Sequence, residues 1–118
     1  MQIGQISMNA HDIDRATGFY SDALGLRLLF RAGDMSFFDC AGVRLMLSKP
    51  EKPEFDHPGS VLYFKVGDID ASYQELQGRG VAFTAPPHLI ARLPDHDLWM
   101  AFFTDTEGNT LALMCEKR

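Results

Sequence analysis

The sequence is poor in cysteine and contains no long apolar run. Its two cysteines, Cys40 and Cys115, lie far apart without a Cys-x-x-Cys spacing, so free buried thiols are expected and a disulfide is the alternative. No apolar segment approaches the length of a membrane span. Residues 1–5 carry no basic stretch ahead of an apolar core, as a signal peptide would. We therefore expect a cytoplasmic protein without a membrane partner.

Positive charge is also scarce. The chain has 11 Lys and Arg against 16 Asp and Glu, a net charge of -5. A protein that binds a phosphate backbone needs a clustered positive face. The aromatic residues fall in apolar runs and are not interleaved with Lys and Arg, so no base-stacking platform is indicated. The composition predicts no nucleic-acid partner.

What the sequence does contain is a repeat. Residues 12–16 read Asp-Ile-Asp-Arg-Ala, and about 55 residues later residues 68–72 read Asp-Ile-Asp-Ala-Ser. Further on, Phe37-Phe38-Asp39 is echoed by residues 102–105, Phe-Phe-Thr-Asp. Two copies of one supersecondary unit predict a pseudo-twofold arrangement with the functional surface where the copies meet.

Hydrophobic periodicity and turn residues predict one strand, one helix and three further strands in each half. In the first half we expect strands over residues 2–10, 26–30, 36–40 and 43–48, and a helix capped by Asp12 or Asp14 that runs to about Ala23. In the second half we expect strands over residues 60–66, 81–84, 98–104 and 110–115, a helix over 68–77, and a long connection from Pro86 to Asp95. The length fits a single domain, with module one at 1–49, a proline-rich linker at 50–59 and module two at 60–118.

This order resembles the vicinal oxygen chelate superfamily, also called the glyoxalase, bleomycin-resistance and dioxygenase superfamily. The resemblance rests on the aspartate that opens each helix, on Phe19-Tyr20 followed by Leu24-Gly25, and on the turn over residues 105–109, and it covers essentially the whole chain. It implies an α+β fold in which two βαβββ modules form a cupped, incomplete mixed β-barrel, often by pairing across a homodimer. The ligand would lie in the cup between the modules.

The resemblance also places the metal-ligand positions of the superfamily at Gln5, Met46, Val61 and Ala112. Zn, Ni, Mn or Fe would require His and Glu donors there, with at most one Gln. Only Gln5 could donate to such a cation, so we expect no metal and no cofactor, and Gln5 is interpreted as a hydrogen-bonding pocket residue. His88 and His96 remain the best candidates for an unusual acid–base or metal role, because imidazole titrates near neutrality.

Residues two apart in a strand share a face, so the four ligand positions also indicate which side chains line the cup. Trp99 lies beside a cup strand, where it could pack structurally or form a pocket wall for a planar ligand. The predicted ligand-binding residues are Gln5, Ser7, Asn9, Arg44, Met46, Val61, Tyr63, Trp99, Ala112 and Met114.

These residues predict a metal-independent protein that binds a small organic molecule, planar or anionic, as a cytoplasmic homodimer. The alternative is a glyoxalase-, epimerase- or dioxygenase-like enzyme with atypical metal ligands, and no catalytic residue is assigned for it. A third possibility is a structural or regulatory dimer whose cup is filled by its own side chains, Met46, Met114, Phe37 and Trp99.

Overall fold

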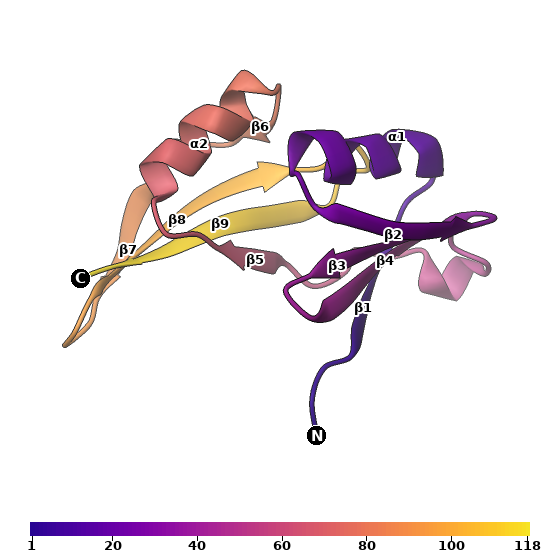
Figure 1. Ribbon diagram of the computed structural model, residues 1–118, viewed down its shortest axis with the longest axis horizontal. Coiled ribbons are helices and arrows are strands. Elements are labelled where there is room, and N and C mark those ends of the chain that lie inside the picture. The colour runs from indigo at the N-terminus through magenta and orange to yellow at the C-terminus, as the bar shows by residue number, and fades with distance from the viewer. The chain divides into compact units, whose positions relative to one another are not determined.

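The computed structural model describes all 118 residues. The chain divides into two compact units, Met1–Gly59 and Ser60–Arg118, and each unit contains one β-sheet and one α-helix (Figure 1). Neither sheet closes on itself. The predicted α+β class is therefore confirmed. None of the helices has the length and apolar character needed to cross a bilayer.

The first unit follows the predicted βαβββ order. Its strands are β1 (Gln5–Asn9), β2 (Arg27–Ala32), β3 (Met35–Cys40) and β4 (Val43–Ser48), its helix is α1 (Ile13–Gly18), extended by a π-helical turn η1 (Phe19–Ala23), and a short 3-10 helix η2 (Pro53–Phe55) follows. The sheet order is β1-β4-β3-β2, with β1 and β4 parallel and the other neighbours antiparallel. The chain returns from β1 to the far side of the sheet through α1, as a strand–helix–strand connection requires.

Local sequence signals explain where α1 begins and where the last hairpin turns. The Asp12 side chain accepts a hydrogen bond from the backbone N–H of Arg15 at 3.1 Å, so Asp12 is the N-cap and Asp14 is not. The turn between β3 and β4 places both Ala41 and Gly42 at positive φ, 51° and 93°, as a tight two-residue hairpin turn demands. These contacts lie within a few residues of each other and were predictable from the sequence.

Helix α1 covers one face of the first sheet (Figure 1), and the core of this unit lies between them. Tyr20, Phe38 and Leu47 are fully buried there. The Tyr20 hydroxyl donates to the Met8 sulfur at 3.6 Å. We call the opposite face of the sheet, which packs on no α-helix, the helix-free face.

The second unit repeats this plan with one difference. Its elements are β5 (Leu62–Lys65), α2 (Ile69–Gly78), β6 (Ala82–Phe83), β7 (His88–Arg92), β8 (Asp97–Thr104) and β9 (Thr110–Lys117). The sheet order is β5-β9-β8-β6, and β7 also pairs with β8. Asp68 caps α2 by accepting from the backbone N–H of Ala71 at 3.1 Å, the counterpart of Asp12.

The long connection predicted between residues 86 and 95 is wrong, because it contains β7. Strands β6 and β7 run antiparallel to the same neighbour, with Phe83 opposite Phe103 and His88 opposite Met100. Between them lies Pro86-Pro87, which has no backbone N–H to donate to the ladder. The two strands are one edge strand interrupted by prolines.

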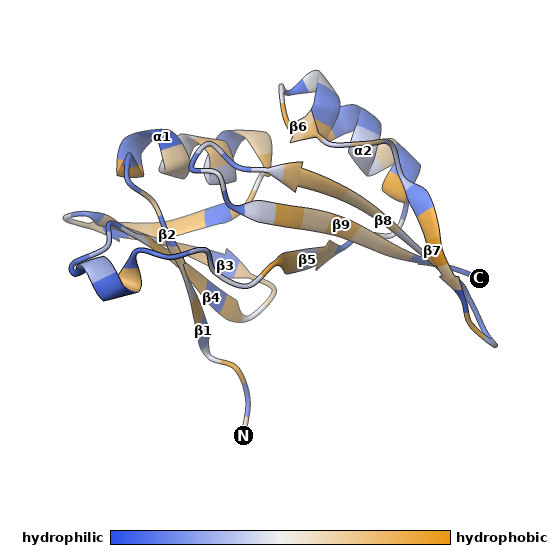
Figure 2. Cartoon of the chain, turned by 180° about the vertical axis from the view of Figure 1, so that it is seen from behind, coloured by the Kyte–Doolittle hydropathy of each residue, from blue (hydrophilic) through white to orange (hydrophobic).

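The core of the second unit lies between α2 and its sheet. Ile69, Phe103 and Leu111 are fully buried. Figure 2 shows hydrophobic residues along β8 and β9 and hydrophilic residues on the outer turns of α2. As in the first unit, one sheet face packs on a helix and the other does not.

Candidate functional site

Five of the predicted ligand-binding residues lie together on the helix-free face of the first sheet. Parallel pairing places Gln5 beside Arg44, Ser7 beside Met46 and Asn9 beside Ser48. The intervening residues Met8, Leu45 and Leu47 are 5%, 2% and 0% exposed and face α1, whereas Ile6 is half-buried. The strand register thus gathers Gln5, Ser7, Asn9, Arg44 and Met46 on one surface.

Gln5 and Arg44 form the polar centre of this surface. Arg44 donates from Nε to Gln5 Oε1 at 2.7 Å, and the Gln5 amide nitrogen lies 3.8 Å from the Met46 sulfur. The Arg44 guanidinium carbon also lies 5.4 Å from the centroid of the Phe37 ring, within the range of a cation–π contact. The amide therefore fixes the guanidinium beside an aromatic ring.

Two phenylalanines complete the surface. Phe37 stacks on Phe30 of β2, with ring centroids 4.5 Å apart and an interplanar angle of 21°. Phe37 is 8% exposed and Phe30 is 48% exposed. The sequence indicates Phe37 only as a possible filler of the cup, and it does not assign Phe30 to the site. The register of β3 against β4, which pairs Phe37 with Met46, is the signal that identifies both.

Asn9 has a structural use that the sequence did not reveal. Its side-chain amide donates to the carbonyl oxygens of Phe55 at 2.6 Å and His57 at 3.2 Å. The His11 ring nitrogen Nε2 lies 2.8 Å from Asp56 Oδ1. The segment predicted as a linker, residues 50–59, is thus tied to the first unit.

A cavity of about 290 Å³ lies at this segment, and none of the predicted ligand-binding residues lines it. It is lined by His11, Lys49, Pro50, Glu51, Lys52, Pro53 and Asp56. Two lysines are balanced by two carboxylates, so its lining favours neither an anion nor a cation.

On the second sheet, the helix-free face holds three of the predicted residues. Tyr63 pairs with Ala112, and Lys65 pairs with Met114. The same register adds Phe102 and Met100 of β8, and His88 of β7 opposite Met100. Val61 is half-buried and precedes β5.

Ala112 is on this face but is not open to a ligand. It is fully buried, and its strand neighbours on either side are Tyr63 and Phe102. Their ring centroids are 6.0 Å apart, although two strand spacings would separate their backbones by about 9.6 Å. The two rings therefore lean over Ala112, and they occupy the space that a longer side chain at this position would need.

Trp99 requires a correction, because it lies on the opposite face. It pairs with Cys115 and shares its face of β8 with Ala101 and Phe103, which are fully buried on the side of α2. The Lys117 ammonium lies 4.3 Å from the centroid of the Trp99 ring. Trp99 is therefore not part of the surface that carries Tyr63.

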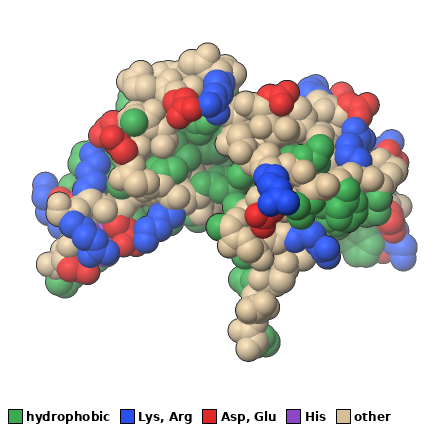
Figure 3. Space-filling model, viewed as in Figure 1, with side chains coloured by type: hydrophobic (Ala, Val, Ile, Leu, Met, Phe, Trp, Pro, Cys, Tyr) green, Lys and Arg blue, Asp and Glu red, His purple; other side chains and the backbone are tan.

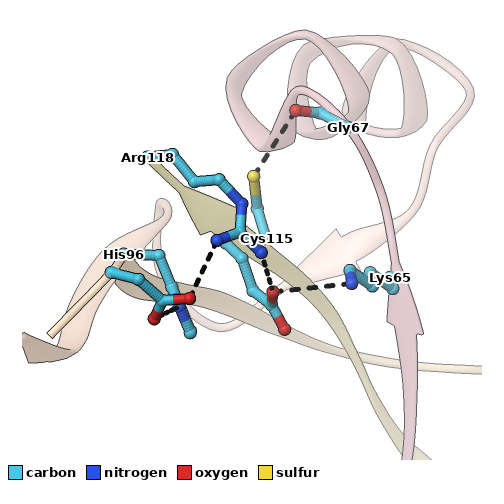
Figure 4. Close-up of polar contacts among 7 residues, drawn as sticks. Lys65, Gly67, His96, Cys115 and Arg118 are labelled. Atoms are coloured by element: carbon cyan, nitrogen blue, oxygen red, sulfur yellow. Dashed lines mark hydrogen bonds and ion pairs between the residues drawn. The ribbon is translucent and has the colours of Figure 1, made fainter. Parts of the chain in front are cut away.

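The structure separates the two histidines that were candidates for acid–base chemistry. His88 lies on the helix-free face, with its ring centroid 6.4 Å from that of Phe102. His96 lies in the β7–β8 turn, where Nδ1 is 2.7 Å from Asp95 Oδ1. Arg118 bonds both Asp95 and Glu116, and Lys65 lies 3.5 Å from Glu116 (Figure 4). The hydrogen bonds from His96 and then Arg118 lower the pKa of Asp95, so this cluster is a surface ion-pair network.

Neither cysteine has the setting of a nucleophile. Burial, with a further contribution from the charge of Asp39, raises the pKa of the Cys40 thiol. Cys115 is buried and its sulfur donates to the carbonyl oxygen of Gly67 at 3.5 Å (Figure 4). Both thiols are free.

The metal that the superfamily resemblance implies does not fit these residues. The one oxygen donor among the four positions, Gln5 Oε1, already accepts from the Arg44 guanidinium, whose positive charge opposes a cation at the same oxygen. Met46 offers a thioether, and Val61 and Ala112 offer no donor atom. No group of three or more His, Cys, Asp or Glu side chains is arranged to hold a metal ion elsewhere in the chain.

Both units follow the βαβββ plan, and comparison with known families identifies one superfamily. The model described as the Glyoxalase/Bleomycin resistance protein/Dioxygenase superfamily matches residues 2–113, so the chain belongs to this superfamily. A glyoxylase-like domain-containing protein of Didymella fabae is 30% identical over 122 residues, which cover 95% of this chain and 91% of that protein.

Two further relatives extend along nearly the whole chain. The protein YraH of Bacillus subtilis is 27% identical over 130 residues, covering 96% of this chain and 97% of that protein. The crystal structure of a superfamily member from Sphaerobacter thermophilus is 26% identical, with a TM-score of 0.79 and coverage of 98% of both chains. The predicted family and fold are confirmed.

Proposed function

We propose that this protein is a metal-independent member of the superfamily that binds a small organic molecule on the helix-free faces of its sheets. The observation that carries the proposal is the hydrogen bond from Arg44 to Gln5. It commits the one oxygen donor at the four metal positions to a fixed cation, and so converts a metal position into a polar recognition site.

The composition of the surface supports ligand binding. Gln5, Ser7 and Arg44 supply hydrogen-bonding groups, whereas Met46 supplies a flexible apolar wall. A few placed polar groups among apolar side chains are typical of small-molecule sites. The sequestration of a ligand requires no acid, base or nucleophile, in agreement with the settings of Cys40 and Cys115.

The proposal includes a cytoplasmic homodimer in which the two units of each chain form a single domain. The two free cysteines accord with a reducing compartment. The edge strand β2 is exposed along its length, and Leu28 and Leu29 are both 39% exposed. Figure 3 shows hydrophobic side chains gathered over β2. An exposed apolar edge is a surface that a second chain can cover.

Metal independence is tested by elemental analysis of protein purified without an affinity tag. We expect far less than one equivalent of Zn, Ni, Mn, Fe or Co per chain, and no change in melting temperature with a chelator, because a bound metal would stabilise the folded state. Stoichiometric metal would overturn the proposal and direct attention to His88.

Ligand binding is tested by a thermal-shift screen of small organic molecules, followed by calorimetry. Gln5→Leu and Met46→Trp should abolish the binding of hits while the fold is retained, because both side chains lie on the helix-free face. Gln74→Leu is the matched control, since Gln74 is exposed on α2. Hits that bind both site variants as they bind the unmodified chain would show that this face is not the site.

One observation favours the alternative of an enzyme with atypical ligands, namely the place of His88 on the helix-free face of the second sheet beside Phe102. A neutral imidazole there could act as a general base. The two functions are separated by incubating each hit with the protein and analysing the product. Turnover that His88→Gln abolishes would establish the enzyme, and unchanged ligand after binding would establish sequestration.

A further inference from the structure

The Arg44 side chain has a cation without a carboxylate partner. No ion pair joins it to any acidic residue of the chain, and the side chain contacts the Gln5 oxygen and the Phe37 ring. The nearest acid in the strand register is Asp39, which pairs with Arg44 across β3 and β4. Asp39 instead accepts from the backbone N–H of Gly42 at 3.1 Å and so caps the hairpin turn.

The charge in this row of the sheet is positive. Asp39 lies between Arg44 on one neighbouring strand and Arg27 on the other, so two guanidinium groups flank one carboxylate. Since Arg44 donates from Nε to Gln5, the remaining N–H groups of its planar fork are the ones left for a ligand. That end of a guanidinium can bind a carboxylate through two parallel hydrogen bonds.

An aromatic surface adjoins this cation. The Phe37 ring contacts the Arg44 guanidinium and stacks on the Phe30 ring, which at 48% exposure is the accessible ring of the pair. Met46 is the strand partner of Phe37, and its thioether is a soft group for contact with an aromatic face. The cation, the thioether and the ring pair therefore form a contiguous strip across β4, β3 and β2.

We propose that this strip binds an aromatic carboxylate, with the carboxylate on Arg44 and the ring against Met46 and the Phe30–Phe37 pair. The inference rests on the proposed function, and it specifies the ligand class. A single guanidinium with a neutral amide beside it matches the single charge of a carboxylate. A phosphate monoester carries more negative charge, so Asp39 would repel it more strongly. Arg27 lies beyond Asp39, so only Arg44 would be beside the phosphate.

The test compares 2-naphthoate with 2-naphthamide, which has nearly the same shape but no charge, by calorimetry on the full chain. We expect 2-naphthoate to bind more tightly, and Arg44→Gln to weaken its binding by about tenfold to a hundredfold while binding of the amide is unchanged. Arg44→Lys should restore only part of the affinity, because a lysine cannot make the bidentate pair. Arg92→Gln is the control for loss of one positive charge, since Arg92 lies on β7 and pairs with Asp97.

Equal affinity of the unmodified chain for the acid and the amide, or an equal affinity of Arg44→Gln and the unmodified chain for the acid, would overturn the inference. A phosphate ester such as 2-naphthyl phosphate that binds more tightly than 2-naphthoate would overturn it as well. These outcomes do not contradict the broader proposal of small-molecule binding. That proposal would still hold if hits of another chemical class bind the unmodified chain and Gln5→Leu abolishes their binding.

Discussion

The contact between α1 and β3 gives a prediction whose size follows from the hydroxyl groups involved. Thr17 Oγ1 donates to the carbonyl oxygen of Ile13 at 2.6 Å and lies 2.5 Å from Ser36 Oγ. A threonine hydroxyl has one hydrogen, so Ser36 is the donor in the second contact. Ser36 is fully buried and Thr17 is 8% exposed, so water does not replace either bond.

Thr17→Val keeps the shape of the side chain and removes the acceptor of the Ser36 hydroxyl. A buried donor without a partner costs about 1–3 kcal/mol, and the Thr17 bond to Ile13 is lost as well. We expect Thr17→Val to lower the free energy of unfolding by about 2–3 kcal/mol. Ser36→Ala should cost only about 1 kcal/mol, because Thr17 retains its bond to Ile13.

The double variant distinguishes this reasoning from simple loss of packing. With both hydroxyls removed, no polar group remains unpaired, so the loss should be about 2 kcal/mol and clearly less than the sum of the single losses. Urea denaturation of the four proteins measures the coupling, and Thr110→Val, at an exposed position of β9, is the control that should change stability by less than about 0.5 kcal/mol. Single losses that add to within about 0.3 kcal/mol would refute the argument.

Three further predictions concern assembly, acid stability and the last turn. Sedimentation at tens of micromolar should give about twice the 13.2 kDa chain mass, and a monomer would contradict the homodimer. Because the pKa of Asp95 is lowered by His96 and Arg118, its contribution to stability is present above the ordinary value of 3.8 and is lost as the pH falls through the lowered value. When the pH falls from neutral to below 3.8, the melting temperature of Asp95→Asn should therefore decrease less than that of the unmodified chain. Equal decreases would show that Asp95 does not contribute to acid sensitivity. Asp105 is 7% exposed and accepts hydrogen bonds from the backbone N–H of Glu107 and from the backbone and side chain of Asn109, each at 2.8 Å. Asp105→Ala should therefore lower the free energy of unfolding, measured in urea, by about 2–4 kcal/mol. A loss below about 1 kcal/mol would contradict this expectation.

Features that depend on neighbouring residues could be predicted from the sequence. Asp12, one of the two predicted caps, and Asp68, which opens the second predicted helix, both cap helices, because a cap involves a side chain and an N–H three residues away. Strand β4 has the predicted bounds, since its apolar alternation and the Ala41-Gly42 turn are local signals. The repeat of these signals predicted two βαβββ units, and the resemblance based on them implied the superfamily and its α+β fold.

The face that each strand presents could be predicted only where the alternation was unambiguous. In β1 and β4 polar and apolar residues alternate, and the predicted inward residues Gln5, Arg44 and Met46 share a face. In β8 residues on both faces are apolar, so the sequence did not show that Trp99 lies on the side of α2. When both faces of a strand are hydrophobic, its sequence does not show which residues face the helix.

Tertiary structure alone decided which distant residues meet. Phe30 joins the candidate surface because β2 pairs with β3 through a bulge between Leu28 and Phe30, and the sequence does not mark that bulge. Strand β7 forms because β8 offers a free edge beyond Pro86-Pro87. Arg44 acquires its place beside Gln5 from the parallel pairing of strands that lie 39 residues apart in the chain. Such pairings depend on the register of one strand against another, which is settled by the packing of the whole sheet and not by any local segment.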